Sequence, residues 1–205
     1  MDLEFLTGTF IRTTHMLFGV IWLGAVYYLL LIQSPALAAA EPGVRKGTLS
    51  AVMPRALAWV RWSSMITLLL GVALFTWEYH RVEGGLGVNH AMKVDGKVTD
   101  RALFTMTAMT LAILLWFVVW FLIWPTWRKI LGTLGTGETP APALMKRAHF
   151  LAQFNFVLSG PMLWLMIAPQ HYRADFTPAA LGAFFVVGMG VMIALLAVGG
   201  RSRAG

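Results

Sequence analysis

Five long stretches of apolar residues dominate the chain, and each is close to the roughly 20 residues that an α-helix needs to cross a bilayer. Shorter polar segments, rich in glycine, proline and charged residues, separate them. The pattern predicts an all-α, polytopic membrane helix bundle that forms a single transmembrane domain over residues 1–205. Its five transmembrane helices are expected, to within a few residues, at 10–32, 56–77, 103–124, 150–168 and 178–198.

The composition supports a membrane protein and excludes several kinds of site. Of the 205 residues, 58% are hydrophobic and 12% are charged, which is more apolar than a soluble domain of this size requires. Cysteine is absent, which excludes disulfides, thiolate metal sites and covalent c-type haem attachment. The net charge of +7 is explained by basic cytoplasmic loops, so nucleic acid is not an expected partner.

The distribution of Lys and Arg predicts the orientation in the membrane. One side of the membrane holds two acidic residues, Glu41 and Glu138, against ten basic ones: Arg45, Lys46, Arg55, Arg61, Arg128, Lys129, Lys146, Arg147, Arg201 and Arg203. The opposite side carries six basic and seven acidic residues. By the positive-inside rule, we expect a cytoplasmic C-terminus and an external N-terminus, in a bacterial inner membrane.

Two connections suggest where the helices end. The polar segment AAAEPGVRKGTLSAVMPR (38–55) is expected to lie along the cytoplasmic interface as a partly amphipathic stretch. Pro125 is expected to close the third span. No internal repeat is convincing in the sequence.

The fourth span combines polar residues with a helix-disrupting pair. Asn155 and Ser159 lie four residues apart, on one helical face, directly before Gly160-Pro161. A proline inside a helix lacks the N–H that the ladder needs, so a kink is expected there. Because polar groups are costly at this depth, the Asn155/Ser159 face should point at protein or cofactor rather than at lipid.

Three histidines are expected at a similar depth near the outer face: His15, His80 and His171. Two neutral imidazoles from different helices are what axial ligation of a b-type haem requires. Imidazole clusters also bind copper or zinc. The alternative is that these are interfacial histidines without a ligand, which is the usual role of a lone histidine beyond the end of a span.

The first span offers further candidates around His15. Gly19, Trp22 and Val26 share its helical face. A glycine one turn from a ligand would leave room for a flat macrocycle, although small residues also serve close helix packing. Arg12, about one turn before His15, is the better candidate for pairing with haem propionates.

Three stretches resemble the urate oxidase N-terminal membrane domain family. NFVLSGPMLWLMIAPQHY (155–172) is similar to its final signature, HMLFGVIWLGAVYYLLLIQSPAL (15–37) to its first helix, and VVWFLIWPTWRKIL (118–131) to one of its helix ends. The first helix is also similar to those of copper-resistance D and protoporphyrinogen-oxidase-like haem membrane proteins. The resemblance points to His15, Gly19, Trp22, Gly24, Pro125, Asn155, Ser159, Pro161 and His171.

What the resemblance implies is a small electron-transfer module. The family's longer members continue into further helices and a c-type cytochrome, which a chain without cysteine cannot hold. A separate periplasmic cytochrome c is therefore the expected redox partner, and a role as subunit of a membrane oxidoreductase is compatible with this. Urate chemistry is not implied, because no purine-binding constellation is visible.

Three hypotheses remain open from the sequence. In the first, b-type haem binds near the outer face between His15 and His171, with His80 as a substitute ligand and with Gly19, Trp22, Arg12, Asn155 and Ser159 nearby. In the second, the chain is a cofactor-free accessory subunit that packs against another membrane subunit of a respiratory or transport complex. In the third, His15, His171 and Met162 handle copper.

Overall fold

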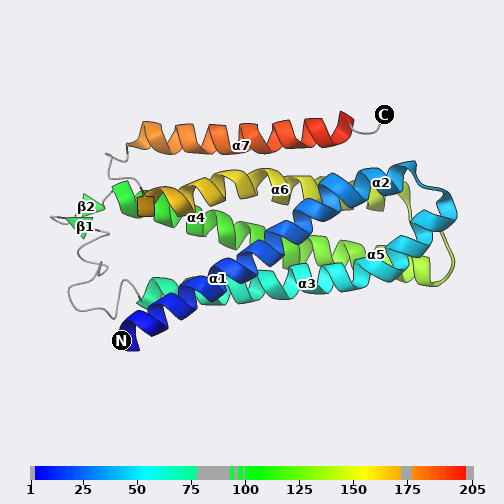
Figure 1. The fold of residues 1–205 in the computed structure, drawn as a ribbon. Helices are drawn as coiled ribbons and strands as arrows, with labels where there is room; N and C mark the ends of the chain where they lie inside the picture. The colour runs from blue at the N-terminus through cyan, green and yellow to red at the C-terminus, as the bar shows by residue number, and fades with distance from the viewer. Residues whose placement is uncertain (1–2, 78–92, 95–96, 99, 172–176, 202–205) are drawn as a thin grey trace.

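The computed structural model describes residues 3–77, 93–94, 97–98, 100–171 and 177–201. Within these ranges, five helical segments are long and apolar enough to cross a membrane: Phe5–Ala39, Pro42–Thr76, Ala102–Gly135, Pro142–Pro169 and Pro178–Gly199. The prediction of an all-α protein with five membrane-spanning helices is confirmed in this form (Figure 1).

The first two spans form a long helical hairpin. The first consists of α1 (Leu3–Tyr27), a π-helical segment η1 (Tyr28–Gln33) and α2 (Ser34–Ala39), and the second is α3 (Pro42–Thr76). The chain turns at Ala40, whose backbone is extended, and Pro42 then starts α3 at a position where its missing N–H is not needed. The Arg45 side chain stabilises the turn by donating to the carbonyl oxygens of Leu37 at 2.7 Å and Ala38 at 2.9 Å.

A second hairpin follows a short two-stranded ladder, in which β1 (Lys93–Val94) pairs antiparallel with β2 (Lys97–Val98). The hairpin consists of α4 (Asp100–Phe117), a π-helical segment η3 (Val118–Ile123), α5 (Trp124–Gly135) and α6 (Pro142–His171). Gly137, with a φ of 88°, adopts the left-handed conformation in the turn before α6. Lys46 Nζ donates to the Gly137 carbonyl at 2.7 Å, which ties the start of α3 to this turn.

The last helix, α7 (Pro178–Arg201), packs along α6 on the outside of the two hairpins (Figure 1). The crossing depends on two buried glycines, Gly160 on α6 and Gly188 on α7. A Cβ atom on Gly188 would lie 2.6 Å from the backbone nitrogen of Pro161, which is closer than real Cβ contacts allow. Small residues therefore bring the two backbones together here, as is common between membrane helices.

Two expectations about helix ends were wrong. Segment 38–55 does not lie apart along the interface: from Pro42 onward it is the first part of α3 and is continuous with the span. Pro125 does not close the third span, because the helix continues to Gly135. The wider π-helical turn of η3 directly precedes Trp124-Pro125, and η1 likewise precedes Ser34-Pro35. Such a turn relieves the clash between a proline ring and the carbonyl one turn back, so the helix passes through the proline.

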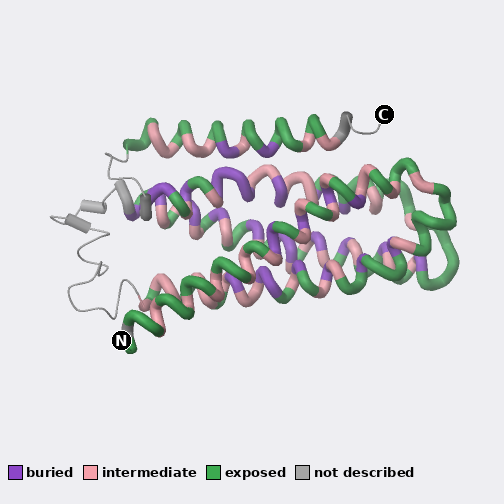
Figure 2. Tube along the Cα trace, viewed as in Figure 1, coloured by how far each residue is buried: buried purple, intermediate pink, exposed green. Residues whose placement is uncertain are grey.

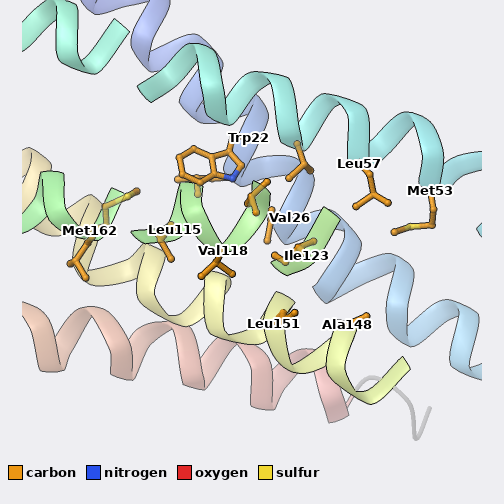
Figure 3. Packing of buried hydrophobic residues seen from close by; sticks show 14 of the residues in the cluster. Trp22, Val26, Met53, Leu57, Leu115, Val118, Ile123, Ala148, Leu151 and Met162 are labelled. Atoms are coloured by element: carbon orange, nitrogen blue, oxygen red, sulfur yellow. The ribbon is translucent and has the colours of Figure 1, made fainter. Parts of the chain in front are cut away.

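The main core lies between the two hairpins, where all four of their long helices contribute buried side chains (Figures 2 and 3). Phe104, Leu115, Ile130 and Leu165 are completely buried there. The outward faces of the helices, and most of α7, carry exposed large apolar residues such as Val186. This distribution suits a bundle whose outer surface faces lipid.

The bundle has two distinct ends. At one, α2 joins α3 and α5 joins α6, and seven exposed basic residues gather there: Arg45, Lys46, Arg55, Arg128, Lys129, Lys146 and Arg147. We call this the basic end. At the opposite end α1 begins and α6 finishes (Figure 1), and we call it the N-terminal end.

Candidate functional site

His15 lies in α1, toward the N-terminal end, and its half-buried imidazole faces α3. Its Nδ1 atom lies 2.9 Å from the carbonyl oxygen of Thr67. Because a carbonyl can only accept, Nδ1 carries the proton. In the neutral ring the lone pair is then on Nε2, which is the state required of a metal ligand. A backbone carbonyl on the second nitrogen is also the usual means by which proteins orient a ligating histidine.

Glycine on α3 makes this position of the ring possible. A Cβ atom on Gly71 would lie 3.1 Å from Cε1 of His15, which is tighter than nine in ten real Cβ contacts. The imidazole therefore occupies the space that the missing side chain leaves. Gly19, one turn after His15, faces the same helix, where its Cβ would meet the Thr67 methyl group at 3.7 Å. In this structure Gly19 serves the contact between α1 and α3.

Asn155 and Ser159 are both completely buried in the interior of α6. Asn155 donates from Nδ2 to the carbonyl oxygen of Leu115 on α4 at 2.9 Å. Ser159 donates to the Phe156 carbonyl at 2.6 Å, so the hydroxyl of Tyr27, also 2.6 Å away, must donate to Ser159 Oγ. The expectation that this face points at protein or cofactor rather than at lipid is confirmed, and its contacts are with α1 and α4.

The Tyr27–Ser159 hydrogen bond gives a common level from which to compare α1 and α6. His15 lies twelve residues before Tyr27, and His171 lies twelve residues after Ser159. At 1.5 Å per residue, each histidine therefore lies about 18 Å along its helix from this hydrogen bond, toward the N-terminal end. The two helices separate in that direction (Figure 1). The two histidines therefore stand at similar depth, on separate helices.

The remaining candidates divide between the core and the surface. Trp22 is 2% exposed in the main core (Figure 3), and its Nε1 has no hydrogen-bond partner among the described residues. Arg12 is exposed on α1, three residues before His15. His149 is exposed near the basic end, whereas His15 lies toward the N-terminal end.

The side chains of the other two candidate metal ligands are not among the described residues. His80 lies outside the described residues, and His171 ends α6 with a side chain that is likewise outside them. Among the side chains that the structure does describe, no three His, Cys, Asp or Glu residues come together as a metal site.

No family model, curated protein or solved structure matches this chain. The resemblance to the urate oxidase N-terminal membrane domain family therefore remains a prediction from three sequence patterns.

An arginine–tryptophan cluster between α3 and the third span was not foreseen from the sequence. The Arg61 guanidinium lies 4.2 Å from the ring centre of Trp120, 4.9 Å from that of Trp124 and 5.3 Å from that of Trp62. Trp120 also donates from Nε1 to the Arg61 carbonyl at 3.2 Å. Cation–π contacts of this kind stabilise a positive charge, and more strongly so where it is removed from water. Tryptophan is common near the ends of membrane spans, so the sequence alone does not single out these three.

Proposed function

We propose that this protein binds b-type haem near its N-terminal end, with His15 as an axial ligand, and transfers electrons. The observation that supports it best is the hydrogen bond between His15 Nδ1 and the Thr67 carbonyl, which orients the ring and leaves Nε2 for a metal. A haem would supply reversible one-electron chemistry. The residues of this chain would bind it, fix its orientation and limit the access of water.

His171 is the proposed second ligand. It stands at the same distance along its helix from the Tyr27–Ser159 contact as His15 does. Arg12, exposed one turn closer to the N-terminal end, is proposed to pair with a propionate. His80 is kept as a substitute ligand.

The charge distribution supports a periplasmic position for this site. The seven exposed basic residues of the basic end are on the opposite side of the bundle from His15, and basic connections favour the cytoplasm. We therefore propose a multi-pass protein of the bacterial inner membrane, with its N-terminal end facing the periplasm. A haem there would be within reach of a periplasmic cytochrome c or of another membrane subunit.

The test is the absorption spectrum of the protein purified with its native pigment. We expect a reduced-minus-oxidised Soret and α-band in the wild type and a loss of at least about tenfold in haem content in His15→Ala. His171→Ala should lose the pigment as well. His149→Ala is the matched control, because His149 is exposed near the basic end, and it should retain full haem content.

Two other outcomes would replace the proposal. A colourless, metal-free preparation that is stably folded would favour the cofactor-free accessory subunit, in which His15 merely joins α1 to α3. Copper bound without porphyrin, and lost in His15→Ala and Met162→Leu, would favour a copper-handling protein.

A further inference from the structure

A cavity of about 260 Å³ lies between the two hairpins, in the half of the bundle nearer the basic end. Residues from α1, η1, α2, α3, η3, α5 and α6 line it. Apart from Val26, its lining residues on the first span follow Tyr27 toward the basic end, whereas His15 lies on the other side of Tyr27. On α3 the lining residues run from Arg45 to Val60, fifteen residues or about 22 Å of helix. The cavity is therefore long and narrow, and it is separate from the proposed haem site.

The polar lining residues lie near one end of the cavity, and the apolar ones lie deeper. Ser34, Arg45 and His149 are all within seven residues, or about 10 Å, of a helix end at the basic end. Arg45 and His149 are exposed, so the cavity opens there. Further along α3, Leu57 (Figure 3) and Val60 line the cavity and are buried. A cavity that is polar at its mouth and apolar along its length suits an amphiphile with a single chain.

Gln33 also lines the cavity, but its carbonyl oxygen does not reach a ligand there. Oε1 is buried within the wall. Nε2 lies 3.6 Å from the sulfur of Met53, which accepts its N–H. The chemistry of the head group is therefore decided by the three residues at the mouth.

Arg45 places a fixed positive charge at the mouth. Its Nε and Nη2 atoms donate to the carbonyl oxygens of Leu37 and Ala38, which holds the guanidinium in place. Nη1 makes no hydrogen bond to any described residue, so its two N–H groups remain for a ligand. A planar guanidinium that is held in this way recognises the oxygens of an anionic head group.

The other groups at the mouth favour a ligand of the same charge. Ser34 is half-buried, and its hydroxyl can donate to an anionic oxygen. His149 is either neutral or positively charged and never negative. Glu41 and Glu138, the acidic residues at the basic end, do not line the cavity. The charges around the mouth therefore select an anion.

We propose that this cavity binds a long-chain carboxylate, the anion of a fatty acid, with its head group on Arg45 and its alkyl chain among the apolar side chains. The narrow interior accepts one chain, so a free fatty acid fits it better than a phospholipid, whose second chain would stay outside. Burial of the chain supplies most of the affinity, and the charge decides which head group is accepted. The alcohol of the same chain length should therefore bind more weakly.

Trp127 lines the cavity and provides a local fluorescence signal. Because bromine quenches indole fluorescence on contact, the probes are ω-bromoundecanoate and ω-bromoundecanol. They are titrated into the full-length protein in uncharged detergent micelles, at a pH at which the acid is ionised, and corrected for partitioning into empty micelles. We expect saturable quenching by the carboxylate at concentrations about five- to tenfold below those needed of the alcohol. Trp127→Phe should lose the saturable component, which identifies the cavity as its source.

Substitutions of Arg45 test the role of its charge. Arg45→Gln should reduce the affinity for the carboxylate to that for the alcohol. Arg55→Gln is the matched control, because it removes the same charge from an exposed position of α3 that does not line the cavity; it should keep the wild-type preference. Arg45→Lys keeps the charge but not both hydrogen bonds to α2, so it should keep most of the preference.

Thermal unfolding of each variant separates loss of the site from loss of the fold. A wild-type protein that binds carboxylate and alcohol alike, or neither of them, would overturn the proposal. Equal losses in folded Arg45→Gln and Arg55→Gln, or loss of the preference in folded Arg45→Lys, would overturn it as well. His15→Ala should leave the quenching unchanged, so this test fails or succeeds independently of the haem proposal.

Competition distinguishes a free fatty acid from a membrane lipid. Undecanoate without bromine should displace the quencher and restore the fluorescence of Trp127. Phosphatidylglycerol and phosphatidylcholine, added to the same micelles, should not. Displacement by either phospholipid would assign the cavity to a two-chain lipid and overturn the proposal.

Discussion

Tyr27 on α1 and Ser159 on α6 are joined by a hydrogen bond of 2.6 Å between residues 132 positions apart in the chain. Ser159 is completely buried, and the Tyr27 ring packs edge-on against Phe156 at a centroid distance of 4.8 Å. This contact fixes α1 relative to α6 at the level where the two helices are close. It also sets the levels of His15 and His171, each twelve residues away from it.

Removing either hydroxyl of this pair should destabilise the bundle. We expect Tyr27→Phe and Ser159→Ala each to lower the free energy of unfolding by about 0.5–1.5 kcal/mol. Because they share one hydrogen bond, the double variant should lose less than the sum of the two single variants. Unfolding in mixed micelles, titrated with SDS and followed by circular dichroism, measures all three. Strict additivity would show that the two hydroxyls do not act on each other.

Gly71 should be needed for the position of His15 rather than for the helix itself. In Gly71→Ala the new methyl group would press on the imidazole at 3.1 Å, which should weaken the Nδ1–Thr67 bond. For a ligand of the proposed haem, we expect about tenfold weaker haem retention, as is typical when the support of a ligand is disturbed. The haem content per chain after purification measures this.

The control for that experiment is Gly24→Ala on α1. A Cβ atom there would meet nothing within 4 Å, so haem content should stay at the wild-type level. An equal loss in both variants would mean that the effect comes from general destabilisation of the protein and not from the contact with His15.

How far the sequence predicts this fold depends on the kind of signal each feature leaves. The five spans are evident from their length and apolarity, and the buried face of Asn155 and Ser159 follows from their spacing. The helix ends are not evident, because proline normally ends a helix. Here two π-helical segments, η1 and η3, allow the helices to continue through Pro35 and Pro125. Nothing in the local sequence indicates that such a segment will form.

The residues of the candidate site also differ in how far the sequence alone identifies them. His15 stands out in the sequence because an ionisable ring inside a span is rare. Its partner Thr67 acts through a backbone carbonyl, which every residue has, so no sequence pattern could identify it. Gly71 could have been identified from the sequence, because Ser63, Thr67 and Gly71 recur every four residues as a stripe of small side chains.

Gly188 should tolerate no larger residue where α7 crosses α6. In Gly188→Ala the added methyl group would be forced onto the Pro161 backbone at 2.6 Å, and overpacking of this kind costs about 1–3 kcal/mol. Gly190→Ala, two residues further on α7, would meet nothing within 4 Å and should be neutral or stabilising by up to about 1 kcal/mol. Opposite changes in stability in the two variants, measured as the midpoints of thermal unfolding, would show that the close contact between α6 and α7 causes the loss in Gly188→Ala.

Arg61 should resist replacement by lysine, although the charge is kept. A planar guanidinium can lie over several indole rings, whereas an ammonium group is compact and strongly hydrated. We expect Arg61→Lys to lower the free energy of unfolding by about 0.5–2 kcal/mol. Arg55→Lys, exposed on the same helix, should change it by no more than about 0.5 kcal/mol. Similar losses in both would argue against the role of Trp62, Trp120 and Trp124.

The proposed orientation can be tested directly because the chain contains no cysteine. Thr139, in the turn between α5 and α6, and Thr177, directly before α7, are both exposed and lie at opposite ends of the bundle. Neither substitution by cysteine changes the charge on which the positive-inside rule acts. In intact cells a membrane-impermeant maleimide should label Thr177→Cys, and it should label Thr139→Cys only after the inner membrane has been permeabilised. The reverse pattern would place the basic end in the periplasm and His15 toward the cytoplasm, so that a periplasmic cytochrome c could no longer be the partner of a haem bound there.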